Sequence, residues 1–400
     1  MLNYDFIIAG AGIVGLTIAY QLIKQFPETS ILIIEKETEL GCHGSGRNSG
    51  VLHSGIYYPE GSLKAKFCAE GAKLMADYCY NYQLPIQRIG KVIVPTKLTD
   101  DGQLDTLYHR AEMNNAKVSL INKQQLKEIE PHANTASERA LYSPYTAIVD
   151  PKSILKNLKK QLEISRVHFS FGDPVIKVNV NSSILHTRIN QYQYGHLFNA
   201  TGQFADIIAH HCDLGLDYTL IPFKGSYYEL NPKSKLTFNG LIYPVPDLKM
   251  PFLGVHTVKT TSGKIYFGPT ALPALGRTHY KGLAGIKIKE AIKISHYLFH
   301  LYIKNQQNFR HHCHTEIFKV LKEYFVRQAK LLVPQLQSAD LIVSQKVGIR
   351  AQLLNKKTKK MEMDFLVERK NNTTHVLNAI SPAFTCAFSL SKYIVRESHV

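Results

Sequence analysis

The stretch DFIIAGAGIVGLTIAYQLI, residues 5–23, decides the fold of this chain. The apolar run 6–9 predicts a strand, and the apolar spacing that follows predicts a helix. Three glycines occupy the turn and the first helical turn. Gly10 permits the tight turn, Gly12 lets the backbone approach a pyrophosphate, and Gly15 allows close helix packing.

A second apolar run, residues 31–34, ends at Glu35, twenty positions after Gly15. An acidic side chain at this place accepts hydrogen bonds from ribose hydroxyls. The helix N-terminus offers N–H groups and the positive end of its dipole to the pyrophosphate. Strand, glycine spacing, helix and distal acid together predict a dinucleotide-binding βαβ unit, whereas the glycines alone would also fit an ordinary turn.

Small and polar residues follow in EKETELGCHGSGRNSG, residues 35–50, where a phosphate-bearing ligand would extend. A nicotinamide enzyme has no need of this cluster. The segment resembles the FAD-dependent D-amino-acid-oxidase-like oxidoreductases, whose pattern is an acid, a short gap and Gly-x-x-x-Ser-x-x-Asn-x-Gly. The resemblance implies FAD as cofactor and adds binding candidates: Lys36, Ser45, Arg47, Asn48 and Ser49. The alternative is a glycine-rich surface loop.

Composition indicates a globular protein of more than one domain. The 400 residues are 44% hydrophobic, and no uninterrupted apolar run reaches the length of a membrane span. The six cysteines include no CxxC pair, which is typical of a reducing compartment. The apolar N-terminal segment lacks the basic start of a signal peptide. We therefore expect a cytoplasmic location of bacterial type.

The chain is strongly basic, with 48 Lys and Arg against 31 Asp and Glu. Residues 281–330 hold ten of these basic residues against three glutamates, with large apolar residues at helical spacing. This pattern favours peripheral contact with an anionic membrane on its inner face, although a solvated helical face or a lysine-rich proteome would also explain it. Neither an RNA-binding module nor a patch of interleaved basic and aromatic residues occurs, which argues against nucleic acid as a partner.

The segment RHHCHTE, residues 310–316, invites a metal interpretation. Consecutive residues of a helix point in different directions, and no second ligand cluster stands at a metal-site spacing. We therefore predict no metal site.

Periodicity predicts further elements. Helices are expected over residues 67–81, 101–114, 153–165 and within 281–330, and strands over residues 91–95, 167–171, 173–179 and 194–202. In the family resembled, the strand near residue 175 contacts adenine, an Ala-Thr-Gly turn closes the FAD domain, and the turn into the last helix meets the flavin. The cofactor contacts so implied are Val175, Ala200, Gly202, Ser381, Ala383 and Thr385.

The resemblance implies an α/β fold with two domains. A discontinuous, Rossmann-like FAD-binding domain would comprise residues 1–80, 150–215 and 345–400. A substrate or cap domain of mixed β-sheet plus helices would comprise residues 81–149 and 216–344.

Longer stretches of the sequence narrow the resemblance to one family within this group. They are SGVLHSGIYYPEGSLKAKFC (49–68), PFKGSYYEL (222–230), LIYPVPDLKMPFLGVHTV (241–258), YFGPTA (266–271), VGIRAQ (347–352) and NAISPAFTCA (378–387). In this order they resemble the L-2-hydroxyglutarate oxidase or dehydrogenase family. The resemblance implies FAD-dependent oxidation of L-2-hydroxyglutarate to 2-oxoglutarate, with hydride transfer from the alpha carbon to flavin N5 and electrons passed to a quinone-type acceptor or oxygen.

Other substrates stay open, because a fold does not fix its substrate. Another 2-hydroxy acid, a glycerol phosphate or an N-alkyl amino acid would suit the same fold. A flavoprotein associated with nucleic acid is the alternative from another class.

The reaction requires a base for the hydroxyl proton, and histidine has the suitable pKa. His53 and His256 are the candidates, and the sequence does not rank them. A dicarboxylic substrate also needs cationic partners, for which Arg350 offers a planar fork.

Lys224 stands where relatives commonly carry arginine, which keeps the charge and loses the bidentate geometry. Tyr57 and Tyr243 are candidate hydroxyl donors to the substrate.

Overall fold

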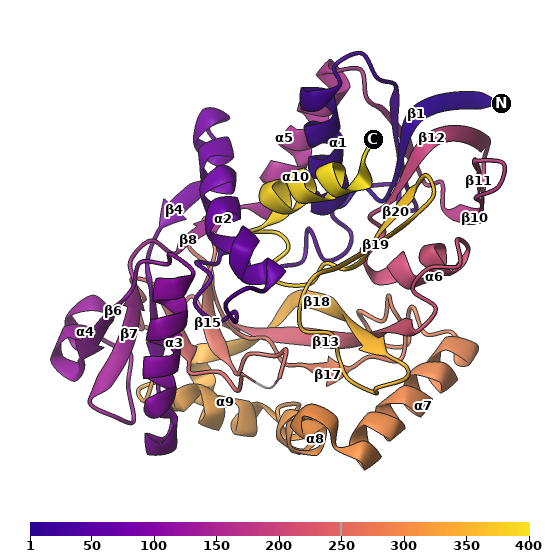
Figure 1. Cartoon of the computed structure of the whole chain (residues 1–400). Helices are drawn as coiled ribbons and strands as arrows, with labels where there is room; N and C mark the ends of the chain where they lie inside the picture. The colour runs from indigo at the N-terminus through magenta and orange to yellow at the C-terminus, as the bar shows by residue number, and fades with distance from the viewer. Residues whose placement is uncertain (249) are drawn as a thin grey trace.

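The computed structural model describes residues 1–248 and 250–400. A mixed sheet, hereafter the large sheet, forms one layer of the molecule (Figure 1). Its strands are β1 (Leu2–Ala9), β2 (Ile31–Glu35), β9 (His168–Phe171), β10 (Val175–Asn179), β11 (Ile184–Thr187), β12 (Gln191–Asn199), β19 (Leu366–Lys370) and β20 (Thr373–Asn378). β1 lies between β2 and β12 and is parallel to both. Stretches far apart in the sequence therefore build one sheet, which is the discontinuous arrangement that the fold prediction requires.

The βαβ unit opens the chain. β1 ends at Ala9, and α1 (Ile13–Gln25) follows a turn in which Gly10 has φ +103°. This backbone conformation suits glycine because it lacks a Cβ. A Cβ on Gly15 would lie 1.9 Å from the Gly10 carbonyl oxygen. Only glycine at position 15 therefore lets α1 pack on the turn.

A second sheet, hereafter the cover sheet, lies below the large sheet in the view of Figure 1. Its strands are β13 (Tyr218–Leu230), β15 (His256–Lys259), β16 (Ile265–Gly268), β17 (Leu272–Pro273) and β18 (Leu341–Asn355). β13 and β18 pair antiparallel, with register running from Tyr218↔Asn355 to Leu230↔Leu341. The domain boundary expected at residue 345 thus falls inside β18, because this whole strand pairs with β13.

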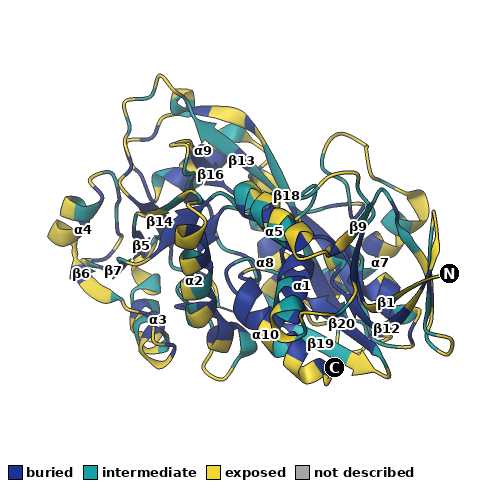
Figure 2. Ribbon diagram, turned by 90° about the horizontal axis from the view of Figure 1, so that it is seen from above, coloured by how far each residue is buried: buried dark blue, intermediate teal, exposed yellow. Residues whose placement is uncertain are grey.

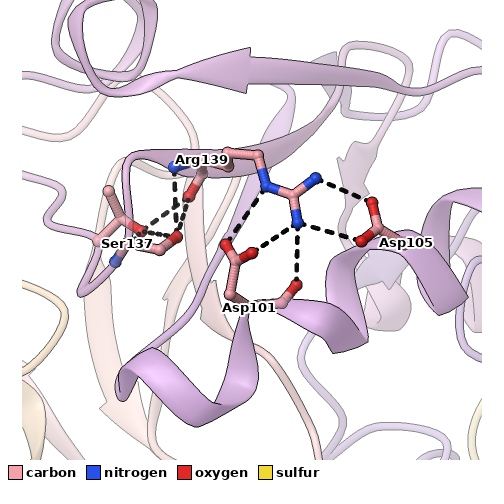
Figure 3. Close-up of polar contacts among 5 residues, drawn as sticks. Asp101, Asp105, Ser137 and Arg139 are labelled. Atoms are coloured by element: carbon pink, nitrogen blue, oxygen red, sulfur yellow. Dashed lines mark hydrogen bonds and ion pairs between the residues drawn. The ribbon is translucent and has the colours of Figure 1, made fainter.

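Smaller sheets stand beside the cover sheet. One contains β14 (Leu241–Pro244), β5 (Lys91–Val94), β7 (Arg139–Ser143) and β6 (Ser119–Asn122), and another contains β3 (Val51–Leu52), β8 (Ala147–Val149) and β4 (Ile86–Arg88). Arg139 of β7 donates to Asp101 Oδ2 at 2.6 Å and to Asp105 Oδ1 at 2.9 Å (Figure 3). These ion pairs fasten α3 (Gly102–Met113) to the sheet.

Helices cover the outer faces, and buried residues concentrate in the strands and on the inner sides of the helices (Figure 2). α10 (Ala387–Ser398) contacts both α1 and α2 (Leu63–Asn81), and α5 (Pro151–Ile164) contacts α1. The remaining helices are α4 (Lys123–Ile129), α6 (Ala205–His210), α7 (Ile288–Lys304), α8 (Phe309–Phe318) and α9 (Lys322–Lys330), with the short 3-10 helices η1 (Leu98–Asp100), η2 (Gly202–Phe204), η3 (Gln306–Asn308) and η4 (Ser338–Asp340). Over residues 1–248 and 250–400, none of the helices is long and apolar enough to cross a membrane.

The expected elements are present, with shifted ends. α2 begins at Leu63, ahead of the predicted start at residue 67, because the Ser62 side chain accepts from the Ala65 N–H and caps the helix. The basic segment 281–330 contains α7, α8 and α9. α7 ends where Asn305 adopts a left-handed conformation, with φ +47°.

Candidate active site

A cavity of about 520 Å³ lies between the large sheet and the cover sheet. Residues from both sheets line it, together with the turn before α10. The predicted site residues that it brings together are Gly10, Gly12, Glu35, Lys36, Ser45, Arg47, Asn48, Ser49, His53, Val175, Ala200, Gly202, Tyr243, His256, Arg350, Ser381, Ala383 and Thr385.

The glycine turn lets backbone segments pack closely at the carboxyl end of β1. A Cβ on Gly10 would lie 2.5 Å from the Ala200 carbonyl oxygen, and one on Gly12 would lie 3.0 Å from Ser45 Oγ. The Ile13 N–H donates to that Ser45 hydroxyl at 2.9 Å, so the serine-bearing loop is joined to the start of α1. The two glycine-rich segments predicted from the sequence therefore meet at one helix N-terminus.

Glu35 ends β2 beside this turn. Its carboxylate accepts from the backbone N–H of Ala11 and of Glu37, each at 3.0 Å. Burial raises the pKa of Glu35, while the two backbone N–H donors act in the opposite direction. The side chain is thereby fixed at the wall of the cavity, with its oxygens near the start of α1.

The loop 41–50 folds on its own side chains. Asn48 Nδ2 donates to the Ser45 carbonyl oxygen at 2.7 Å, and the Gly50 N–H donates to Asn48 Oδ1 at 2.8 Å. The Arg47 guanidinium lies 4.3 Å from the centroid of the Tyr280 ring and donates to the Val347 carbonyl oxygen at 3.3 Å. Arg47 thus connects this loop to β18 of the cover sheet.

The C-terminal turn meets β3 and His53, which directly follows this strand. Thr385 Oγ1 accepts from the His53 backbone N–H at 3.2 Å and donates to the Val51 carbonyl oxygen at 3.3 Å. α10 begins at Ala387, directly after this turn. The positive end of the α10 dipole therefore lies beside the cavity wall.

His256 is a neutral histidine with a defined tautomer. Its Nδ1 lies 2.8 Å from the Gly254 carbonyl oxygen, which can only accept, so Nδ1 carries the hydrogen and Nε2 has the free lone pair. Burial lowers its pKa to about 4, against the opposing effect of that hydrogen bond. Its ring packs on the Tyr243 ring at 4.1 Å between centroids. Packing and the hydrogen bond both hold the imidazole in place.

His53 differs from His256 in its hydrogen bonding. Its Nδ1 is buried and has no hydrogen-bond partner among the described residues. Burial lowers its pKa to about 3, and the positive charge of Lys91 contributes. Both candidate histidines are therefore neutral at pH 7, and the structure fixes the tautomer of His256 alone of the two.

Arg350 is the cation that lines the cavity on the cover sheet, in the same wall as the two candidate histidines. It donates through Nη1 to the Pro251 carbonyl oxygen, and its guanidinium lies 5.5 Å from the Phe252 ring centroid. Within residues 1–248 and 250–400, no carboxylate forms an ion pair with it. Burial lowers the pKa of Arg350, although an arginine side chain stays protonated in proteins. An anionic group in the cavity would find a guanidinium without a counter-ion.

The histidine-rich segment supports the wall from behind. His312 Nε2 donates to the Ala271 carbonyl oxygen at 3.2 Å, and Glu316 Oε2 accepts from the Ala271 N–H at 2.7 Å. The His312 ring stacks on Phe252 at 4.6 Å between centroids. His311 and His314 are exposed, so the histidines of this helix do point in different directions.

Two predicted substrate residues do not line the cavity: Lys224 and Tyr57. Side chains alternate along a strand, and Phe223, Gly225 and Tyr227 of β13 take the cavity side, which turns Lys224 away. Tyr57 is buried in an apolar cluster beside the cavity. The sequence analysis missed Phe223, Tyr227, Phe252 and Thr270, which line the wall, and the alternation along β13 was the available signal for the first two.

The residues present fit a flavin dinucleotide. The pyrophosphate would lie against the backbone of Gly10 and Gly12 and the N-terminus of α1. The Glu35 carboxylate would accept hydrogen bonds from the ribose. The cavity continues from there to His53, His256 and Arg350. One ligand reaching from the glycine turn to the histidines would lie along this wall.

Comparison with known proteins agrees with this geometry. The family model described as FAD dependent oxidoreductase matches residues 5–397. The chain is 34% identical to L-2-hydroxyglutarate dehydrogenase of Indibacter alkaliphilus, covering 97% of both chains, and 31% identical to that of Escherichia coli K12, covering 98% of this chain and 93% of the relative.

Solved structures share the fold. The reduced L-alpha-glycerophosphate oxidase of Mycoplasma pneumoniae with FAD bound superposes with a TM-score of 0.78 at 21% identity, covering 100% of this chain and 96% of the other. The glycine oxidase of Geobacillus kaustophilus gives a TM-score of 0.74 at 17% identity, covering 99% and 94%. The family match, the relatives and the cavity lead to one conclusion: this chain belongs to the FAD dependent oxidoreductase family.

Proposed function

We propose that this protein oxidises L-2-hydroxyglutarate to 2-oxoglutarate with FAD as its cofactor. The observation that carries the proposal is a guanidinium without a counter-ion, Arg350, in the same cavity wall as two neutral histidines. A 2-hydroxy acid brings the carboxylate and the hydroxyl proton that these groups complement. Relatives named L-2-hydroxyglutarate dehydrogenase, alike over nearly the full length, support this substrate.

The residues divide the work as follows. Arg350 binds the carboxylate next to the hydroxyl and so orients the alpha carbon. His256 accepts the hydroxyl proton at Nε2, because its Nδ1 is held as a donor by Gly254. The C–H electron pair leaves as hydride while the C–O bond becomes a carbonyl, and bound FAD supplies the hydride acceptor. His53 also lines the cavity and assists in positioning the substrate oxygen.

An anaerobic visible spectrum of the holoprotein tests this function. We expect L-2-hydroxyglutarate to bleach the oxidised-flavin band and the D-enantiomer to leave it unchanged. Bound flavin that stays oxidised with the L-form would refute the substrate while leaving the family assignment intact. A panel containing another 2-hydroxy acid, glycerol 3-phosphate and an N-methyl amino acid would then identify the substrate class.

A membrane-facing surface is proposed for α7, which lies along the lower edge of the molecule in Figure 1. Ile288, Ile292 and Phe299 are 78%, 66% and 63% exposed, whereas Ile294 and Leu301 are buried. At about 100° per residue, the exposed three fall on one face and the buried two on the opposite face. Lysines at positions 287, 289 and 293 flank the exposed face, which suits anionic lipid on the inner face of a bacterial membrane.

Vesicle sedimentation tests this contact. We expect binding to phosphatidylglycerol vesicles that weakens in Ile292→Asn and is absent with phosphatidylcholine. Equal recovery of the wild type in the supernatant with both lipids would refute it. Such a location favours a quinone-type acceptor over oxygen, which reoxidation of the reduced holoprotein by a soluble quinone and by dissolved oxygen would compare directly.

A further inference from the structure

Lys91 is a buried lysine that neither the family resemblance nor the proposed reaction uses. It begins β5 and is 1% exposed. The Tyr57 and Tyr243 rings near its ammonium belong to an apolar cluster that also contains Val51, Ile56 and Ile93. Lysine is rarely buried so completely without a partner, because removing an ammonium from water costs several kcal/mol.

Three other buried cations, Arg277, Lys319 and Lys64, each have an acidic group in reach. Arg277 pairs with Asp206 at 2.5 Å, and Lys319 pairs with Glu316. Lys64 has Asp364 within electrostatic reach. Among the described residues, no carboxylate forms an ion pair with Lys91 or raises its pKa. Over residues 1–248 and 250–400, Lys91 is thus, like Arg350, a cation without a carboxylate partner.

Aromatic rings hold the ammonium beside the cavity. Lys91 Nζ lies 4.8 Å from the Tyr57 ring centroid and 5.2 Å from the Tyr243 ring centroid. Tyr243 lines the cavity and packs on His256. The charge of Lys91 also reaches both catalytic candidates, since it contributes to the lowered pKa of His53 and of His256.

From this position, the positive charge of Lys91 can act on a bound substrate through space, without direct contact. The surroundings are apolar and aromatic, so water screens the charge weakly. The two rings attract the ammonium, but they do not neutralise its charge as a carboxylate would. Arg350 complements one carboxylate of a substrate, and Lys224, the expected partner of the second, faces away from the cavity.

We propose that Lys91 is a specificity-determining residue that selects substrates with a second negative charge. The proposal rests on the oxidation of L-2-hydroxyglutarate proposed above and names the group that recognises its distal carboxylate. The substrate dianion supplies the negative charge that Lys91 does not find among the described residues. Lys91 acts through space from behind Tyr57 and Tyr243, while Arg350 holds the carboxylate next to the hydroxyl.

The test compares two substrates that differ in one charge. L-2-hydroxyglutarate carries a distal carboxylate, and L-2-hydroxyglutaramate carries an amide of the same shape in its place. For each, kcat and KM are measured on flavin-loaded wild type, Lys91→Met, Lys91→Arg and Lys97→Met. Lys97 is exposed on the same segment and provides a control with the same substitution.

We expect wild type to prefer the dicarboxylate and Lys91→Met to lose roughly 10- to 100-fold of that preference, mainly through KM. Lys91→Arg keeps the charge and should retain most of the preference, and Lys97→Met should match wild type. A general loss of packing would lower activity on both substrates alike and leave their ratio unchanged.

The outcomes separate this proposal from the proposed function. No oxidation of L-2-hydroxyglutarate by flavin-loaded wild type would refute the function itself. Oxidation with an unchanged substrate ratio in Lys91→Met, or loss of the ratio in Lys224→Met instead, would refute the role of Lys91 alone. If Lys91→Met does not retain flavin, binding to wild type decides: glutarate and glutaramate that perturb the flavin spectrum with equal affinity would overturn the proposal.

Discussion

Replacing Arg350 with methionine should lower activity strongly without a comparable loss of stability. Arg350 is half-buried in the cavity wall, so most of the desolvation of its guanidinium is a cost of folding and not of substrate binding. At an effective dielectric constant of about 20, a carboxylate roughly 3.5 Å away interacts with it by about 4–5 kcal/mol. The predicted loss in kcat/KM is therefore roughly 10³-fold.

The free energy of unfolding of Arg350→Met should not fall in the same way. Arg350→Met removes a buried charge that has no acidic partner among the described residues, together with one hydrogen bond to the Pro251 carbonyl oxygen. That bond is worth about 1 kcal/mol, and relief of the unpaired charge offsets it. We expect the free energy of unfolding of Arg350→Met to lie within about 1 kcal/mol of wild type or above it.

The assay pairs anaerobic flavin reduction with thermal unfolding of the same preparations. Arg350→Lys keeps the positive charge but loses the planar, bidentate donor geometry of the guanidinium, so its rate of flavin reduction should lie between those of Arg350→Met and wild type. Arg88→Met, an exposed change on β4, serves as the control. A kcat/KM within threefold of wild type, or a stability loss above about 3 kcal/mol that accounts for lost activity, would refute the reasoning.

Further predictions concern pH, the glycine turn and α3. The folded-state pKa of His256 is about 4, below the ordinary 6.5, so its contribution to stability is complete above pH 6.5 and is lost as pH falls toward 4. Urea unfolding at a series of pH values should show this loss. His256→Gln should flatten the pH dependence of stability and abolish rapid flavin reduction. Gly10→Ala should lose FAD, because φ is +103° at this position and the Cβ would lie 2.5 Å from the Ala200 carbonyl oxygen. The ratio of visible to 280 nm absorbance measures the FAD content. Gly102→Ala is the control and should keep FAD, since its Cβ would meet nothing within 4 Å. Arg139→Ala should cost only about 0.5–1.5 kcal/mol in thermal unfolding, because its side chain is 37% exposed, and should leave flavin content unchanged; a larger loss would show that α3 depends on these ion pairs.

The sequence by itself determined the local features. The βαβ unit, the glycine turn, α3, α5 and the loop 35–50 depend on residue spacing and on backbone conformations that glycine permits, and both are readable within a few residues. The motif runs identified the family, and most of the site residues that they predicted line the cavity.

Only the tertiary structure decided which of these side chains meet. β18 joins β13 instead of the large sheet, and this pairing, with the alternation of side chains, turns Lys224 away from the cavity. The Gly254 carbonyl fixes the tautomer of His256, and Lys91 reaches Tyr243 because β5 and β14 are neighbours. Strand partners and burial arise between segments far apart in the chain, so local spacing carries no record of them.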